Sequence, residues 1–272
     1  MTILDRIVEK KLTEVAQRKA TIPAQSLEKL PTIQRTVNSA RAAIQAAGST
    51  GIIAEFKRKS PSKGVINDSV DVIATTQGYV KAGAACLSVL TDEPFFGGKP
   101  DDLIKARAAN PTTPVLRKDF IVDPYQLLEA KAWGADLVLL IAACLTPDQV
   151  KVLGMEAKRL GLEVLLEVHD EEELDQCLAI EELPQIVDLI GVNNRSLKTF
   201  VTSVETSLRL ADRIPSAFVK VAESGLSSAT TIQVLRDAGF EGFLIGEAFM
   251  KTSAPAEALA ALVADSLMQT SS

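Results

Sequence analysis

Short apolar runs rich in β-branched residues alternate along the chain with amphipathic segments of helical period. The runs begin near residues 51, 85, 114, 136, 162, 187, 217 and 241, so consecutive starts lie 22 to 34 residues apart. Continuous apolar strands, each followed by one helix, are typical of a parallel sheet covered on both faces. The predicted helices include residues 70–81, 123–133, 146–160 and 229–238, and several lead into a glycine. The pattern predicts an α/β fold with eight β–α units.

Eight units in about 220 residues suit a (β/α)8 TIM barrel, whose usual length is roughly 250 residues. A doubly wound open sheet is the alternative, and it usually places its ligand at one switch point beside a glycine-rich turn. Here polar residues stand at the carboxyl ends of most strands, which favours the closed barrel. We therefore expect a single domain over residues 1–272, with a helical extension at 1–48 and the barrel at 49–272.

The extension predicts two helices separated by Pro23 and Pro31. Apolar residues recur at helical spacing in the first of them, and residues 33–47 form the second, which ends at Gly48. Basic residues accompany the apolar stripe, and we expect them to form a solvated helix face. The alternative is that they shield a pocket or attract an anionic ligand. The stripe is Ile3, Ile7, Val8, Leu12 and Val15, and the basic residues are Lys10, Lys11, Arg18 and Lys19.

Composition excludes several classes of protein. The net charge of −6 at pH 7 argues against a broad nucleic-acid-binding surface, so no nucleic-acid partner is expected. One histidine and three scattered cysteines make zinc sites and Ser-His or Cys-His catalysis improbable. The cysteines are expected to be free thiols in a reducing compartment. The longest apolar run, residues 137–145, is far short of the ~20 residues that cross a bilayer. We expect a cytoplasmic protein with no membrane partner.

Charged side chains stand where the predicted strands end. The first strand ends at Glu55 and Lys57, which are two positions apart and so point to the same face. In the fifth strand the same parity predicts that Leu165 and Glu167 face inward. One such strand end is commonly an ion pair, but many of them converging on one barrel mouth indicate a functional site. The other strand-end residues are Lys118, Asn193, Arg195, Glu223, Ser224, Gly246 and Glu247.

A phosphate site is predicted after the last two strands. Ser224 and Gly225 follow the seventh strand and Gly246 follows the eighth, and these small residues leave backbone N–H groups uncovered. A helix that starts near Ser227 would add its positive amino-terminal end. The alternative for each glycine is an ordinary turn.

Two further features stand near the predicted strand ends. The loop TDEPFFGG follows the second strand, and we expect Phe96 within it to lie against an aromatic ligand. His169 could reach the site, but we expect it to have a loop or capping role, and we expect Trp133 to pack in the core.

Seven segments together carry a family resemblance: AEFKRKSPSKG, VLTDEPFFGG, LRKDFIVDPYQ, LLEVHDEEEL, IGVNNRSLKTF, AESGL and LIGEAFM. In this order and spacing, they resemble indole-3-glycerol-phosphate synthase over nearly the whole chain. The resemblance implies the tryptophan-pathway closure of 1-(2-carboxyphenylamino)-1-deoxyribulose 5-phosphate to indole-3-glycerol phosphate, CO₂ and water. It implies a phosphosugar substrate and neither a metal nor an organic cofactor.

The resemblance also implies roles for the site residues. Lys118 is the general acid for the carbonyl, and Glu167 is the general base for the later loss of a proton and water. Lys57 holds the substrate carboxylate, and Glu55 orders Lys57 and a substrate hydroxyl, although the second proton transfer is left open among Glu55, Lys57 and Glu167. Substrate-binding residues are Asn193, Arg195, Leu197, Phe96, Glu223 and Ser224, and phosphate-binding residues are Ser60, Gly225, Gly246 and Glu247.

Two expectations follow from the chemistry of these roles. A lysine acid works best with a lowered pKa, and we expect burial among other cations to lower the pKa of Lys118. Some family members carry serine where Glu247 stands, and a carboxylate would repel phosphate there. We therefore expect the Glu247 side chain to turn away from the phosphate.

Two other functions remain open at this point. One is another phosphosugar barrel enzyme such as phosphoribosylanthranilate isomerase, which would lack the set of Lys57, Lys118 and Glu167. The other is a noncatalytic barrel that binds an anionic metabolite or a partner enzyme. We expect a monomer, with a weak homo-oligomer as the alternative.

Overall fold

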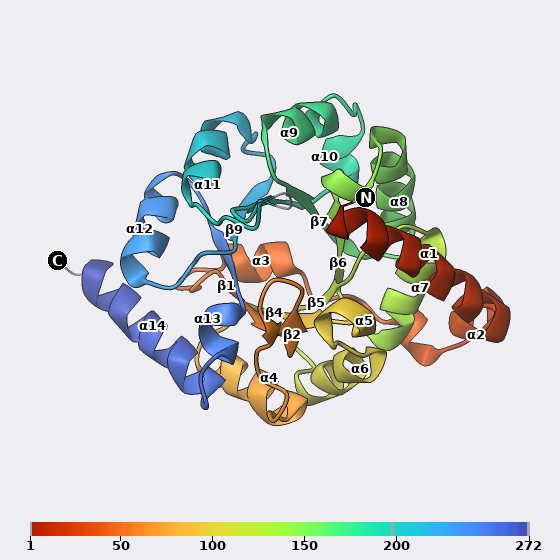
Figure 1. Ribbon diagram of the computed structural model, residues 1–272, viewed down its shortest axis with the longest axis horizontal. Helices are drawn as coiled ribbons and strands as arrows, with labels where there is room; N and C mark the ends of the chain where they lie inside the picture. The colour runs from red at the N-terminus through yellow and green to blue at the C-terminus, as the bar shows by residue number, and fades with distance from the viewer. Residues whose placement is uncertain (1, 197–198, 271–272) are drawn as a thin grey trace.

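The eight predicted strands form a closed barrel in the computed structural model, which describes residues 2–196 and 199–270. Each strand pairs in parallel with both neighbours, in the order β1-β10-β9-β8-β7-β6-β5-β4 (Figure 1). The predicted (β/α)8 TIM barrel is confirmed, and the open sheet is excluded. The strands are β1 Ile52–Phe56, β4 Cys86–Leu90, β5 Val115–Lys118, β6 Leu137–Ile141, β7 Glu163–Val168, β8 Leu189–Asn193, β9 Val219–Glu223 and β10 Gly242–Ile245.

Helices cover the outside of the barrel (Figure 1). Several begin at a side chain that accepts a backbone N–H group, such as Asp71 before α4, Thr146 before α8 and Ser228 before α12. The helix α7 ends at Gly134, whose positive φ of 95° favours glycine. The longer helices are α4 Val72–Lys81, α6 Pro100–Ala109, α7 Pro124–Trp133, α8 Pro147–Arg159, α9 Glu171–Leu178, α11 Glu205–Leu210, α12 Ala229–Asp237 and α14 Pro255–Thr270.

Short elements occupy the loops. The polar loop after β1 forms a small antiparallel hairpin of β2 Lys59–Ser60 and β3 Gly64–Val65. Single turns of helix follow three other strands: α5 Glu93–Phe96, η2 Ala142–Cys144 and α13 Glu247–Met250. Two more, α10 Leu183–Ile186 and η3 Ala211–Arg213, lie between a longer helix and the next strand.

Alternate residues of each strand face the barrel interior and the surrounding helices. In β7, Val164 and Leu166 belong to the apolar layer between strands and helices, whereas Leu165 packs in the barrel interior. This alternation agrees with the predicted parity, which places Glu167 inside. Because the last interior position of a strand lies at its carboxyl end, polar residues there point into one mouth.

The predicted second helix at residues 33–47 is wrong. The chain forms α1 Ile3–Thr21, α2 Ala24–Glu28, the 3-10 turn η1 Pro31–Gln34 and a short α3 Ala40–Gln45, with no regular structure between Arg35 and Ser39. The buried carboxylate of Asp136 explains the break, because it accepts a hydrogen bond from Arg35 Nη1 at 2.7 Å and from the backbone N–H of Asn38 at 2.8 Å. These bonds hold the chain extended where the local pattern favours a helix.

Helix α3 closes the amino-terminal end of the barrel. Its buried residues Ala40 and Ile44 pack with the interior side chains of the strands, and the backbone N–H of Ala40 donates to Glu163 Oε2 at 2.8 Å. In Figure 1, α3 accordingly lies within the ring of outer helices. The second half of the extension is therefore part of the barrel core.

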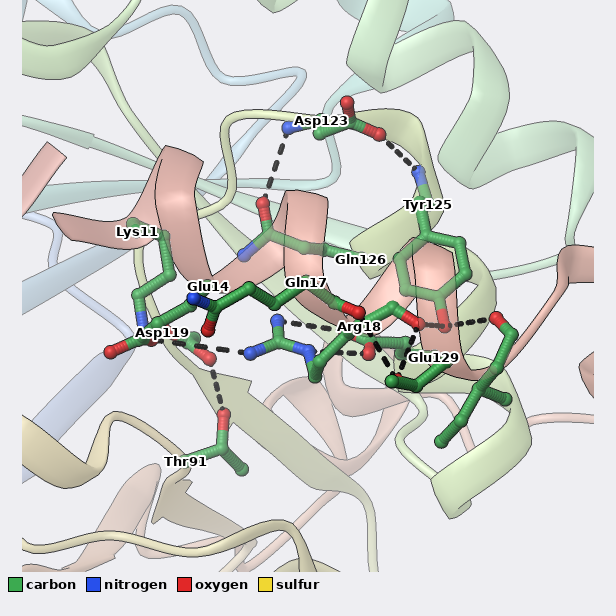
Figure 2. Close-up of polar contacts among 12 residues, drawn as sticks. Lys11, Glu14, Gln17, Arg18, Thr91, Asp119, Asp123, Tyr125, Gln126 and Glu129 are labelled. Atoms are coloured by element: carbon green, nitrogen blue, oxygen red, sulfur yellow. Dashed lines mark hydrogen bonds and ion pairs between the residues drawn. The ribbon is translucent and has the colours of Figure 1, made fainter. Parts of the chain in front are cut away.

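Helix α1 is docked on the barrel by a buried charge. The expected solvated basic face holds for Lys10 and Lys19, which are exposed, but not for Lys11. Lys11 is 1% exposed, and its Nζ lies 2.8 Å from Asp92 Oδ2 and 3.0 Å from Asp119 Oδ1. Figure 2 shows Lys11 of α1 beside Asp119, which directly follows β5. Because a buried charge is costly unless it is paired, these contacts hold α1 over the carboxyl end of the barrel. Leu12, predicted in the apolar stripe, is instead 52% exposed.

The fully buried Arg117 extends this network to α7. Its guanidinium donates to Asp119 Oδ2 at 2.9 Å and to the Gln126 carbonyl at 2.6 Å, and it stacks 4.3 Å from the ring centroid of Trp133. Trp133 thus packs against a cation. A second contact between α1 and α7 joins Arg18 Nε to Glu129 Oε1 at 2.7 Å (Figure 2).

Among the helices of residues 2–196 and 199–270, none is long and apolar enough to cross a membrane.

Replacing Lys11 by methionine should destabilise the fold, because it leaves two buried aspartates without the cation that they share. We expect the free energy of unfolding to fall by about 3–5 kcal/mol in urea denaturation. The control is Lys10→Met, which removes the exposed lysine next to it and should change stability by less than about 0.5 kcal/mol. Equal stability of the two variants would contradict the docking role of Lys11.

Candidate active site

A cavity at the carboxyl ends of the strands brings the predicted strand-end residues together. Lys57, Lys118 and Glu167 all line it, although they come from β1, β5 and β7 or the position just after. Each occupies the interior parity of its strand. The remaining polar residues that line this cavity include Glu55, Ser60, Asn193, Arg195, Glu223 and Ser224.

Lys118 lies among carboxylates at the centre of the cavity. Its Nζ donates to Glu223 Oε2 at 2.6 Å and to Glu167 Oε2 at 3.4 Å. Burial by itself would lower the pKa of Lys118, but Glu223, Glu167 and Glu55 raise that pKa above its ordinary value. The expected lowering is therefore wrong, because the groups that surround Lys118 are anions and not cations.

Glu167 is held on both of its oxygens. Oε2 faces Lys118, and Oε1 accepts a hydrogen bond from Asn193 Nδ2 at 3.2 Å. Burial would raise the pKa of Glu167, but Lys118, His169 and Asn193 hold that pKa well below its usual range. The carboxylate is therefore ionised at neutral pH.

Glu223 has the opposite character. Burial and the nearby charge of Glu167 raise its pKa to about 7, against the attraction of Lys118. Of the two carboxylates that contact Lys118, Glu167 is thus ionised and Glu223 can change its charge near neutral pH.

Glu55 and Lys57 form an ion pair, with 2.8 Å between Lys57 Nζ and Glu55 Oε1. Burial raises the pKa of Glu55, but Lys57 and Lys118 bring it below its ordinary value. Together with Lys118 and its carboxylates, this pair makes a group of alternating positive and negative side chains that reaches the loop after β1.

Two interior glycines make room for the buried carboxylates. A Cβ atom on Gly191 would lie 2.2 Å from Glu223 Oε1, and one on Gly246 would lie 2.6 Å from Glu55 Oε1. Any side chain at either position would displace a carboxylate from its lysine. Gly246 therefore has a steric reason to be glycine, and its predicted phosphate contact stays a prediction.

A second cavity adjoins the first at the ends of β9 and β10. It is lined by the predicted phosphate residues Gly225, Gly246 and Glu247, and by the cations Lys57, Lys63, Arg195 and Lys251. The backbone of Ser224 and Gly225 has positive φ angles of 66° and 75°, which is the conformation of a turn that exposes successive N–H groups. Ser60 lines only the first cavity, whereas Ser62 lines both.

The Glu247 side chain stays at the mouth of this second cavity. Its Oε2 lies 3.0 Å from Arg195 Nη2 and its Oε1 lies 3.9 Å from Lys63 Nζ. Although burial would raise the pKa of Glu247, Arg195 and Lys63 lower it. The carboxylate is thus neutralised by cations.

An apolar wall faces the charged residues. Phe96, as predicted, lines the cavity, and its ring centroid lies 5.9 Å from that of Phe120. Ile3, Leu4 and Ile7 of α1 line the cavity from above. Leu197, predicted to enclose the aromatic ring, lies outside the described residues.

Sequence reasoning missed several of the residues that form or support this site. Phe120 was not among the predicted residues, and His169 was expected to have only a loop or capping role. Both stand two positions after a site residue, Lys118 and Glu167 respectively, so strand parity identifies both as pointing into the barrel mouth. The α1 residues carry no such signal, because only the tertiary structure places α1 at the cavity. In the described part of the chain, no group of three or more His, Cys, Asp or Glu side chains is arranged to hold a metal ion.

Solved structures share this fold at low sequence identity. 3-Hexulose-6-phosphate synthase from Salmonella typhimurium aligns with a TM-score of 0.62 and 14% identity, over 80% of this chain and 98% of that one. Thiamine phosphate pyrophosphorylase from Pyrococcus furiosus aligns with a TM-score of 0.59 and 13% identity, over 85% and 98%. These two similarities support the barrel alone.

Sequence comparison identifies the family. The profile of indole-3-glycerol phosphate synthase matches residues 4–262. The indole-3-glycerol phosphate synthase of Burkholderia ambifaria is 48% identical over 260 residues, which is 95% of this chain and 97% of that protein. The enzyme of the same name from Bacteroides thetaiotaomicron is 48% identical over 264 residues, or 94% and 96%. This chain therefore belongs to the indole-3-glycerol phosphate synthase family.

Proposed function

We propose that this chain closes the ring of 1-(2-carboxyphenylamino)-1-deoxyribulose 5-phosphate to give indole-3-glycerol phosphate, CO₂ and water, with Lys118 and Glu167 as the acid–base pair. The observation that carries this assignment of roles is that Lys57, Lys118 and Glu167 line one cavity next to a second, cationic one. One molecule with a carboxylate at one end and a phosphate at the other can contact all three side chains. The reaction involves no net oxidation and so calls for no redox cofactor.

In the proposed first step, Lys118 protonates the substrate carbonyl oxygen while the ring carbon that bears the carboxylate attacks the carbonyl carbon. A benzoate carbon is a weak nucleophile toward a ketone, so the carbonyl has to be polarised by a nearby acid. The three carboxylates favour the protonated form of Lys118. Protonation of Glu223 would remove one of these negative charges and make Lys118 a stronger acid.

After loss of CO₂, Glu167 would take a proton from carbon as the hydroxyl group leaves, and a protonated lysine of the cavity would give that hydroxyl group the proton with which it departs as water. The Glu167 carboxylate is ionised and oriented by Asn193, which suits a base that must be ready when the intermediate forms. Glu55, which contacts Lys57, belongs to the same set of charges. Lys57 would hold the substrate carboxylate until it departs as CO₂.

The second cavity would bind the phosphate. Backbone N–H groups near Gly225 and Gly246 and the cations Lys63 and Arg195 suit an anion, and Ser60 would approach from the loop after β1. Because the Glu247 carboxylate is paired with Arg195, phosphate would have to use the backbone N–H of Glu247. Clamping both ends of the substrate folds the ribulose chain against the ring.

The two alternative functions are less well supported. A phosphoribosylanthranilate isomerase would share the phosphate end but would have no need for the set of Lys57, Lys118 and Glu167. A noncatalytic barrel would have no need to bury Lys118 against two carboxylates, which is costly. An assay of indole-3-glycerol phosphate formation from the anthranilate-derived substrate separates all three.

We also propose that the chain is a monomer in the cytoplasm and forms one domain over residues 1–272. Three free cysteines, Cys86, Cys144 and Cys177, support a reducing compartment. The burial of α3 in the barrel supports a single domain that includes the extension.

Replacing Lys118 by methionine should abolish turnover, because it removes the proposed proton donor and keeps the apolar stem. The fold should still form, although with lower stability, because Glu167 and Glu223 lose the cation that they share. Product formation and circular dichroism measure the two effects. Lys105→Met, which removes an exposed lysine of α6, is the matched control and should keep wild-type activity. Wild-type activity in Lys118→Met would refute its role as general acid.

Replacing Glu167 by glutamine should lower kcat by roughly 10²–10⁴, the usual contribution of one acid–base group. Glutamine has nearly the same shape and can still contact Asn193, so KM should change far less than kcat. Steady-state kinetics provide the measurement. Each tenfold step in kcat corresponds to ~1.4 kcal/mol of barrier, so a change of about twofold is too small for the loss of an acid–base group. A kcat within a factor of about two of the wild type would therefore show that Glu167 takes no part in the proton transfer.

The pH profile of kcat/KM should show an inflection near pH 7 that comes from Glu223. Its pKa is raised to about 7, so the side chain is neutral below that pH and charged above it. Glu223→Gln keeps the side chain neutral at every pH, and the inflection should disappear. The exposed Glu205→Gln in α11 is the control and should keep it. An unchanged inflection in Glu223→Gln would assign the titration to another group.

A further inference from the structure

The single histidine of the chain, His169, lies between two carboxylates. Its Nε2 is 3.1 Å from Glu167 Oε1, and its Nδ1 is 3.1 Å from Glu173 Oε2. The side chain is 8% exposed. His169 directly follows β7, so its ring reaches back along the inner face of the strand toward the proposed general base.

The start of α9 holds the ring in place. Glu173 Oε2 also accepts the backbone N–H of His169 at 2.8 Å, and the N–H of Glu173 donates to Asp170 Oδ1 at 3.0 Å. Asp170 is the capping residue of α9. Helix capping therefore fixes Glu173, and Glu173 fixes the imidazole that faces Glu167.

The imidazole carries a positive charge at neutral pH. Burial would lower the pKa of His169, but the two carboxylates raise it to about 10. Two titratable groups act directly on the imidazole of His169, Glu167 on β7 and Glu173 on α9. Cys144 of η2 lies close to both carboxylates. Lys118 of β5 lies on the far side of Glu167. The Nε2 of His169 makes no hydrogen bond of good geometry within the described residues, so charge attraction carries the contact with Glu167.

Glu167 is thus held from three directions. Lys118 contacts Oε2, whereas Asn193 and His169 contact Oε1. His169 is not among the described residues that line the cavity, so any effect on the substrate passes through Glu167. A general base works only when its lone pair points at the proton that it removes.

We propose that His169 is a positioning residue that orients the Glu167 carboxylate for proton removal. The proposal rests on the proposed role of Glu167 as general base. The competing explanation is a purely structural role, in which His169 only supports the cap of α9. The two roles can be tested separately, because Nε2 contacts Glu167 and Nδ1 contacts Glu173. The side-chain amide of glutamine takes the place of Nε2 and can reach Glu167, whereas that of asparagine takes the place of Nδ1 and can reach only Glu173.

Kinetics of the two variants test the proposal. His169→Asn should keep the cap and lose roughly 10- to 100-fold in kcat with little change in KM, the effect of one charge-assisted contact. His169→Gln should recover the part of this loss that comes from holding the carboxylate in place, and the part that comes from the positive charge should stay lost. Both variants lack the positive charge, so the pKa of Glu167 should rise and the acidic limb of the kcat profile should move to higher pH. Wild-type kcat and an unmoved acidic limb in His169→Asn would overturn the proposal.

A spectroscopic measurement tests the contact without any assay of activity. Because the chain has one histidine, the imidazole resonances of the full-length protein report His169 alone. Its pKa should fall in Glu167→Gln and in Glu173→Gln, since each removes one of the two neighbouring carboxylates. An unchanged titration in Glu167→Gln would overturn the proposal even if the His169 variants failed to fold. If the titration responds but the wild type forms no indole-3-glycerol phosphate, the proposed function fails while the contact stands.

Discussion

The active-site architecture depends on burying one lysine among carboxylates. Lys118 contacts Glu223 and Glu167, and the charge of Glu55 acts on it as well. None of these charges could be buried alone at reasonable cost, and each is supplied by a different strand. The closed barrel is what allows the pairing, since only a barrel points the last interior residue of every strand toward one axis. Gly191 and Gly246 contribute by leaving the volume that the carboxylates occupy.

Strand β5 links this site to the rest of the fold. Lys118 points into the mouth, whereas its neighbours Arg117 and Asp119 point outward into the network with α1 and α7. The same alternation that points one lysine into the cavity thus buries a second cation against Trp133. Helix α1, docked through Lys11, contributes apolar side chains to the cavity wall. The stability of the extension and the shape of the proposed ring pocket therefore depend on one short segment.

Some of the differences between expectation and structure share one cause, which is a buried charge from a distant segment. The region around Asn38 is extended because Asp136 accepts its N–H group. The pKa of Lys118 is raised because its neighbours are acids from other strands. Local patterns carry no information about which charge will stand opposite, and in each case that charge decides the outcome.

The sequence by itself determined the eight β–α units, the inward parity of Glu167 and the set of strand-end residues. These follow from periodicity, which is a local property of the chain. Only the tertiary structure decided which of those residues touch, where α1 and α3 pack, and which carboxylate titrates near neutral pH. Pairing and burial depend on the distances between segments far apart in the chain, and the closing of the barrel sets those distances.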